Sequence, residues 1–105
     1  MSEVALVVVQ PVDPDRYDEA TNALGAIVEA VHANDDGCLL YALHGVPGDR
    51  SRVVLVEKWA SQEALDAHIA QPHVAALADI QALDGPGEVI VLETLGYGEP
   101  VKGAL

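Results

Sequence analysis

The sequence predicts an α+β fold in which strands and helices follow the order β-α-β-β-α-β. Two observations lead to this prediction. Four short stretches are rich in Val, Leu and Ile, as buried strands are. Between the first two stretches, and again between the last two, apolar residues recur at every third or fourth position, as on the buried face of a helix. A chain of 105 residues can form one modest core, so we expect a single domain.

The first strand and helix are predicted from the segment that ends at Gly37. Residues Glu3–Gln10 (EVALVVVQ) are short, β-branched and apolar, which indicates a buried strand. Asp13 is placed to cap a helix that begins at Pro14, because proline is favoured at the first helical position. The apolar stripe of this helix spans about five turns and contains Tyr17, Ala20, Leu24, Ile27, Val28 and Val31. Gly37 is placed to end it in a left-handed conformation.

The middle of the chain predicts a hairpin followed by helices. Residues Cys38–Val46 and Arg52–Trp59 are the two expected strands, and Pro47–Ser51 has turn chemistry. Ser61 caps a short helix that carries Leu65, His68 and Ile69 on one face, and Pro72 begins a further helix lined by Val74, Leu77, Ala78 and Gln81. After a loop at Asp84–Gly87, residues Glu88–Leu95 form the last strand.

This order of elements predicts a ferredoxin-like, four-stranded antiparallel sheet with helices on one face. The first and last strands are too apolar for their other face to meet water, and no further element is left to cover it. We therefore expect a homodimer in which two sheets pack together. Residues 1–96 are expected to form the domain, and the glycine-rich tail, residues 97–105, is a candidate contact to the partner subunit.

Charge and cysteine content exclude several classes of function. The net charge is −12, and the five Lys and Arg residues are scattered along the chain. We expect binding neither to nucleic acid nor to a membrane surface, because both are anionic. A single cysteine, Cys38, excludes an internal disulfide. The N-terminal region has six consecutive apolar residues and no basic start, so neither a signal peptide nor a membrane span is predicted and the expected location is the cytoplasm.

Common catalytic motifs are not found. His68 and His73 are five positions apart, whereas two metal ligands on one helix need a spacing of three or four, and Pro72 separates them. We therefore expect no metal. The glycines of the tail lack the spacing of a phosphate-binding loop. Ser61 follows Trp59 closely, but its position marks it as a helix cap rather than a nucleophile.

Trp59 and His68 are the main candidate site residues. Trp59 ends a strand two residues before Ser61, which predicts an indole at the mouth of the wedge between sheet and helices. His68 faces the same wedge. Two interpretations stay open: a buried core pair, or an apolar pocket with one imidazole base. Tyr41, His44 and Glu57 are candidate polar contacts, and His73 is expected at the surface or at the helix junction, apart from this pair.

The string GCLLYALH from Gly37, followed after a turn by RVVLVEKWASQEALDAHIAQPHVAAL from Arg52 to Leu77, resembles the antibiotic biosynthesis monooxygenase (ABM) family, including its quinol-monooxygenase-like members. The resemblance implies a ferredoxin-like subunit in a dimeric α+β barrel. It also implies oxygenation of electron-rich phenols, anthrones or quinols without metal, flavin or haem, with dioxygen as co-substrate. Trp59 and His68 match positions that line the pocket in such proteins. Haem-degrading relatives carry an asparagine on the first strand, which this chain lacks.

The leading hypothesis is a cofactor-independent monooxygenase of a small aromatic, quinol or polyketide-like phenol. His68 would be the base, Trp59 a stacking wall, and Tyr41, His44 and Glu57 the further substrate contacts. The alternative is a non-catalytic dimeric protein of the same fold that binds a small molecule or is purely structural. A closed wedge without a cavity would favour that alternative.

Overall fold

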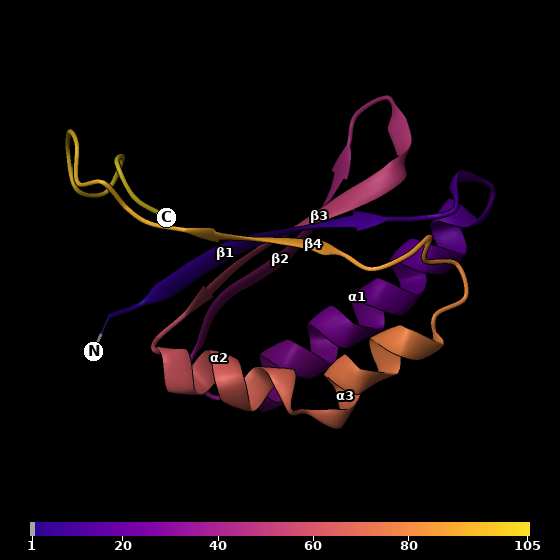
Figure 1. The fold of residues 1–105 in the computed structure, drawn as a ribbon, viewed down its shortest axis with the longest axis horizontal. Coiled ribbons are helices and arrows are strands. Elements are labelled where there is room, and N and C mark those ends of the chain that lie inside the picture. The colour runs from indigo at the N-terminus through magenta and orange to yellow at the C-terminus, as the bar shows by residue number, and fades with distance from the viewer. Residues whose placement is uncertain (1) are drawn as a thin grey trace.

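The computed structural model describes residues 2–105, and its elements follow the predicted order (Figure 1). The strands are β1 (Val4–Pro11), β2 (Cys38–Val46), β3 (Asp49–Trp59) and β4 (Glu88–Leu92). They form one sheet in the order β2-β3-β1-β4, and every neighbouring pair is antiparallel. The predicted ferredoxin-like arrangement is confirmed.

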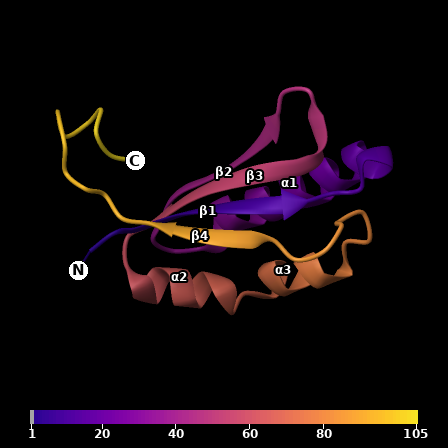
Figure 2. The ribbon, with the colours of Figure 1, turned by 45° about the horizontal axis from the view of Figure 1, so that its top comes forward.

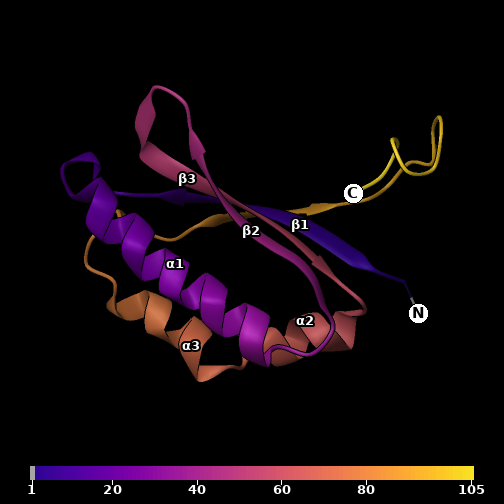
Figure 3. The same ribbon diagram turned by 180° about the vertical axis from the view of Figure 1, so that it is seen from behind.

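The helices lie together on one face of this sheet (Figure 2). They are α1 (Tyr17–Asn34), α2 (Gln62–Ile69) and α3 (Pro72–Ala75), with 3-10 turns at Pro14–Arg16 and Ala76–Asp79. Seen from behind, α1 runs diagonally across the sheet beside α2 and α3 (Figure 3). This helical layer closes one side of the core, which lies between it and the sheet.

Most predicted boundaries hold, and the differences have local causes. The side chain of Asp13 accepts a hydrogen bond from the backbone of Asp15, and that of Ser61 accepts one from Ala64, so both caps are confirmed. However, Pro14 begins a 3-10 turn and α1 itself begins at Tyr17. The predicted hairpin turn is too long, because two residues, Pro47 and Gly48, are enough to reverse the chain.

β4 ends at Leu92 rather than at Leu95, as predicted from sequence. Leu92 pairs with Ala5, and only Val4 of β1 lies beyond this pair, so β4 ends close to the end of its partner strand. The following tail leaves the sheet (Figure 1) and is largely exposed. Near its end, Lys58 Nζ donates a hydrogen bond to the backbone oxygen of Leu105.

Alternation along the strands separates two apolar faces. The helix-facing side contains the buried Leu6, Val53, Leu55 and Trp59. On the other side, the register aligns Val7 with Val56 and with Ile90, and Val56 with Ala42, so an apolar row crosses the sheet. Among residues 2–105, no helix packs against this outer row. The chain therefore has one face that its own helices leave uncovered.

Gly37 forms a tight corner between α1 and β2. Its φ is +79°, and a Cβ at this position would lie 2.6 Å from the Cβ of Ala64 in α2. Its backbone oxygen accepts a hydrogen bond from the backbone of Ala60 at 2.8 Å. The corner thus brings the end of α1 against the start of α2, which a side chain larger than hydrogen would prevent.

Gly37→Ala is expected to lower the free energy of unfolding in two ways. The left-handed conformation costs about 1–2 kcal/mol for a residue with a Cβ, and overpacking against Ala64 adds about 1–3 kcal/mol. Gly48→Ala is the matched control, because Gly48 has the same φ of +79° but nothing within 4 Å of an added Cβ. Urea denaturation of both variants measures the difference. An equal decrease in the free energy of unfolding for both variants would mean that the contact with Ala64 costs no stability.

Candidate functional site

A cavity of about 420 Å³ lies between the sheet and the helices α2 and α3. Its walls are mostly apolar and include Leu6, Val8, Leu55, Leu65, Val74 and Leu77. Four residues with polar side chains also line it: Gln10, Tyr41, Glu57 and His68. The edge strand β4 contributes Val89 and Val91, which are 60% and 67% exposed. A largely apolar hollow with a few convergent polar groups is typical of a small-molecule site.

His68 contributes the one imidazole in the lining of this cavity. It lies in the last turn of α2, and 5% of its surface is exposed. The ring centroids of Trp59 and Tyr41 lie 4.4 Å and 5.3 Å from that of His68. These two aromatic rings restrict rotation of the imidazole, so its orientation relative to the cavity is fixed by packing.

A buried carboxylate holds one nitrogen of this imidazole. His68 Nδ1 lies 2.5 Å from Asp35 Oδ2, and His73 Nε2 lies 2.9 Å from Asp35 Oδ1. The Asp35 side chain is 1% exposed and that of His73 is 16% exposed. The second pair is close but not aligned as a hydrogen bond. The expectation that His73 lies apart from His68 is therefore wrong: the turn at Pro72 brings the two rings back to one carboxylate.

Trp59 lies deeper than predicted. It is completely buried and does not line the cavity, so its expected place at the mouth of the wedge needs correction. The reason is that Trp59 points toward the helices from the end of a central strand, with His68 packed over it. Its Nε1–H donates a hydrogen bond to Glu57 Oε1 at 3.1 Å. Trp59 therefore supports two cavity residues rather than forming the wall itself.

Glu57 and Tyr41 do reach the cavity, from paired positions of β3 and β2. Burial raises the pKa of the Glu57 carboxyl above its usual value, and the hydrogen bond from Trp59 together with the charge of His68 only partly opposes this. Burial and the nearby carboxylates of Glu57 and Asp35 raise the pKa of the Tyr41 phenol, so Tyr41 stays neutral. The neutral Tyr41 is thus able to present a hydrogen-bond donor inside an apolar pocket.

His44 does not belong to this arrangement. It is exposed, and its Nδ1 lies 3.1 Å from the backbone oxygen of Ala42. Because side chains alternate along β2, His44 and Tyr41 lie on opposite faces of the sheet. The cavity therefore contains two of the three polar contacts expected from the sequence.

Glu57→Gln is expected to raise the free energy of unfolding at pH 7. A carboxyl whose folded-state pKa is raised costs stability once the pH exceeds its unfolded value, and the amide removes this cost while its oxygen still accepts from Trp59. The gain should vanish below about pH 4, where the carboxyl is neutral in both states. Unfolding at several pH values tests this, with the exposed Glu29→Gln as control. A gain that does not depend on pH would contradict the interpretation.

Comparison with known proteins identifies the family. The sequence profile of the antibiotic biosynthesis monooxygenase family matches residues 4–79. The chain belongs to this family. A comparison with curated proteins finds no match. The membership supports a monooxygenase role in general terms, and it confirms the resemblance found from sequence.

Solved structures similar to this ABM chain include proteins from several organisms. Rv0793 of Mycobacterium tuberculosis is 31% identical, with 93% of this chain and 100% of that one covered and a TM-score of 0.78. PA3566 of Pseudomonas aeruginosa is 24% identical, with 91% and 97% covered and a TM-score of 0.81. A conserved protein of Methanosarcina mazei Go1 is 21% identical, with 88% and 92% covered and a TM-score of 0.76. The latter two likenesses concern the fold.

Two residues of the candidate site in this ABM chain, Asp35 and Gln10, were missed by sequence reasoning. Asp35 lies in the NDDG segment, where acidic residues are typical of a solvated turn. Gln10 lies at the end of β1, and its Nε2 donates hydrogen bonds to the backbone oxygens of Pro11 and Gly85, which fixes its side chain at the cavity. The sequence signal that could have indicated Asp35 was indirect. Both His68 and His73 needed a buried hydrogen-bond partner, and no other residue had been assigned to that role.

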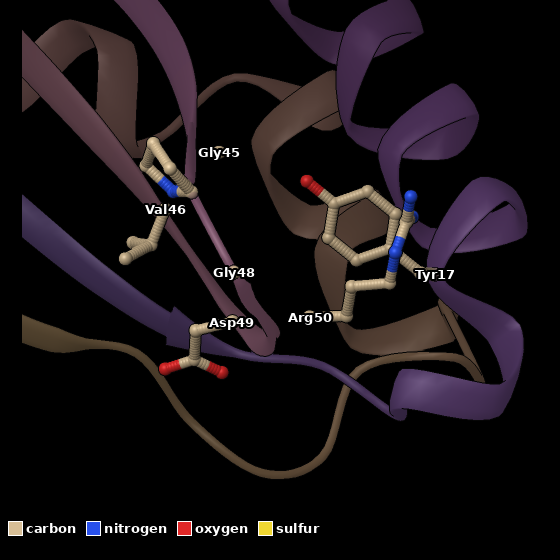
Figure 4. A pocket seen from close by; sticks show the side chains of 7 residues that line it. Tyr17, Gly45, Val46, Gly48, Asp49 and Arg50 are labelled. Atoms are coloured by element: carbon tan, nitrogen blue, oxygen red, sulfur yellow. The ribbon is translucent and has the colours of Figure 1, made fainter.

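A second hollow lies at the tip of the β2–β3 hairpin (Figure 4). It is lined by Tyr17 and by residues of the turn, and the guanidinium of Arg50 lies 4.6 Å from the centre of the Tyr17 ring. This hollow contains none of the predicted site residues. Among the described residues, no helix is long and apolar enough to cross a membrane.

Proposed function

We propose that the chain is a cofactor-independent monooxygenase of a small electron-rich aromatic, such as a quinol or a polyketide-like phenol. The observation that carries the proposal is a clamped imidazole, His68, on the wall of an apolar cavity, with its Nδ1 at a buried carboxylate. A base in a largely apolar pocket suits a reaction whose first step is loss of a substrate proton. Membership of the ABM family supports the same chemistry.

In the proposed reaction, the imidazole of His68 removes a proton from a substrate carbon or hydroxyl. The resulting anion transfers one electron to dioxygen, and the radical pair recombines to form a carbon–oxygen bond. The peroxide then takes the proton back from the imidazolium. For a substrate with a reactive methylene group, cleavage of the O–O bond and loss of the second C–H proton release water and leave a carbonyl. One oxygen atom enters the product and the other leaves as water. The substrate itself supplies the two electrons that reduce this second atom, so no separate reductant is needed.

The other polar groups of the cavity have roles that fit an anionic intermediate. The Tyr41 phenol stays neutral, so it is available to donate a hydrogen bond to developing negative charge. The raised pKa of Glu57 favours its protonated form and reduces repulsion of that charge. Trp59 supports the site from behind His68 and Glu57. The volume of about 420 Å³ lies in the range of ordinary small-molecule sites.

A non-catalytic protein with a filled pocket is less well supported. That alternative calls for a closed wedge in which a backbone carbonyl satisfies His68. Instead, the partner of His68 is the carboxylate of Asp35, and a cavity lies beside the ring. A small-molecule carrier with the same cavity would bind the substrates below without consuming oxygen, so the test distinguishes the two functions.

We also propose that the chain is a homodimer whose subunits meet through the outer face of the sheet. The apolar row at Ala42, Val56, Val7 and Ile90 supports this proposal, because the helices of the same chain leave the row uncovered. The tail, residues 97–105, carries the exposed Tyr97 and Val101, and is proposed to contact the partner subunit.

Oxygen consumption tests the proposed activity. Purified protein is mixed with anthrone-type and quinol-type substrates, and oxygen uptake is followed with an electrode, with chelator added to remove trace metal. Uptake that needs both protein and substrate is the expected result. Binding without uptake would favour the carrier. If wild type and His68→Ala consume oxygen alike, His68 is not the base.

A further inference from the structure

Three side chains that belong to separate segments meet beside the cavity: Asp35 after α1, His68 in α2 and His73 in α3. The two histidine nitrogens face different oxygens of the one carboxylate, at 2.5 Å and 2.9 Å. Within residues 2–105, Asp35 forms ion-pair contacts with these two histidines and with no other residue. The Asp35 side chain is only 1% exposed, and a buried carboxylate is costly unless nearby groups stabilise its charge. The two imidazoles are the groups placed to do this.

The position of Asp35 makes this need stronger. It follows directly on α1, and its backbone N–H donates to the oxygen of Val31 at the end of that helix. The C-terminal end of a helix carries a partial negative charge, which disfavours a nearby anion. Asp35 therefore stands at an unfavourable place for a carboxylate, so the hydrogen bond with His68 and the nearby His73 nitrogen have both burial and the helix end to offset.

A count of protons assigns the tautomer of His68. An ionised carboxylate has acceptors and no donors, so at 2.5 Å the Nδ1 of His68 must carry the hydrogen. In a neutral imidazole, the other nitrogen, Nε2, is then the one with a free lone pair. Because Asp35 occupies the Nδ1 side and His68 lines the cavity, Nε2 is the nitrogen left for a substrate proton.

We propose that Asp35 is the positioning residue of the site, which holds His68 as the Nδ1–H tautomer, and that His73 braces the other oxygen of the same carboxylate. The catalytic consequence of this inference rests on the proposed function, since it concerns the base of that reaction. The tautomer itself does not, because it follows from contacts within the protein. The aromatic rings of Trp59 and Tyr41 complete the clamp around the imidazole.

The distances favour hydrogen bonds over a shared cation. Two ligand atoms bonded to one tetrahedral zinc ion lie about 3.3 Å apart, given bonds of about 2.0–2.1 Å. The 2.5 Å between His68 Nδ1 and Asp35 Oδ2 is much shorter, and it matches a charge-assisted hydrogen bond. The pair Asp35 and His73, at 2.9 Å but not aligned, needs a small rotation rather than a separation to bond.

The experiment is nitrogen NMR of protein labelled with ¹⁵N-histidine, which reads the protonation of each ring nitrogen without any substrate. In wild type, His68 is expected to carry its hydrogen on Nδ1. In Asp35→Asn, the amide is able to donate as well as accept, so the Nε2–H tautomer of His68 gains population. Asp36→Asn is the matched control, because Asp36 is adjacent and exposed, and its spectrum should equal that of wild type.

Oxygen uptake gives the second readout. Asp35→Asn should lower kcat by at least about tenfold, while Asp36→Asn leaves it unchanged, because a wrong tautomer removes the base without emptying the pocket. An Nε2–H tautomer in wild type would overturn the proposal even if Asp35→Asn fails to fold. So would one equivalent of zinc ion that binds at micromolar concentration and shifts both His68 and His73. If His68 carries its hydrogen on Nδ1 but no tested substrate causes oxygen uptake, the proposed function is wrong and the inference about the tautomer stands.

Discussion

His68→Gln is expected to lower the rate of oxygen consumption by roughly 10²–10⁴-fold, the usual contribution of one general base. Glutamine occupies a similar volume and its side-chain amide is able to donate to Asp35, but it does not take up a proton at neutral pH. Substrate binding should change much less than kcat, because the apolar walls of the cavity are untouched. Steady-state oxygen uptake over a range of substrate concentrations separates the two effects.

His32→Gln is the matched control for this experiment. His32 lies exposed in α1, outside the cavity, and its Nε2 lies 2.9 Å from the backbone oxygen of Tyr41, a bond that a glutamine amide is able to replace. Circular dichroism of both variants checks the fold. A His68→Gln enzyme that keeps more than about a tenth of wild-type kcat would place the base elsewhere.

Ile90→Lys is expected to convert the proposed dimer into monomers. Ile90 is 42% exposed on the outer face, opposite Val7 in the register, so in the proposed dimer it is buried against the partner. Both subunits would then bury a charge without a counter-ion, which costs several kcal/mol, so the dissociation constant should rise by roughly 100-fold or more. Sedimentation velocity at several protein concentrations measures it.

Ile69→Lys controls for the substitution itself. Ile69 is 60% exposed at the end of α2, on the helix side of the sheet, so a lysine there should leave the mass unchanged. Wild type that sediments as a monomer at high concentration would refute the dimer directly. Equal effects of Ile90→Lys and Ile69→Lys would point to general destabilisation rather than to an interface.

The fold was predictable because each element carries its own local signal. Val, Ile and Leu runs mark the strands, and Asp13, Ser61 and Pro72 mark the helix starts. The ends of elements were less predictable because they depend on partners. β4 ends one pair short of Val4, the first residue of β1, and the sequence after Leu92 does not indicate where this pairing ends.

The site was predictable only where the direction of a side chain follows from the two-residue repeat of a strand or the 3.6-residue repeat of a helix. Strand alternation placed Glu57 on the side of Trp59, and helical spacing placed His68 toward the wedge. For Tyr41 and His44, alternation predicted opposite faces and left open which of the two lines the cavity. The grouping of Asp35 with His68 and His73 was not predictable, because it joins positions 33 and 38 residues apart through the corner at Gly37 and the turn at Pro72. The depth of Trp59 depended likewise on what packs over it.

The open position of Val89 and Val91 has a consequence for the thermodynamics of binding. These side chains line the cavity from an edge strand, yet they stay 60% and 67% exposed. An apolar ligand seated there would remove that surface from water and become part of the core that the chain leaves incomplete. Its association should therefore carry a negative change in heat capacity, which calorimetry at several temperatures detects as a binding enthalpy that becomes more favourable on warming.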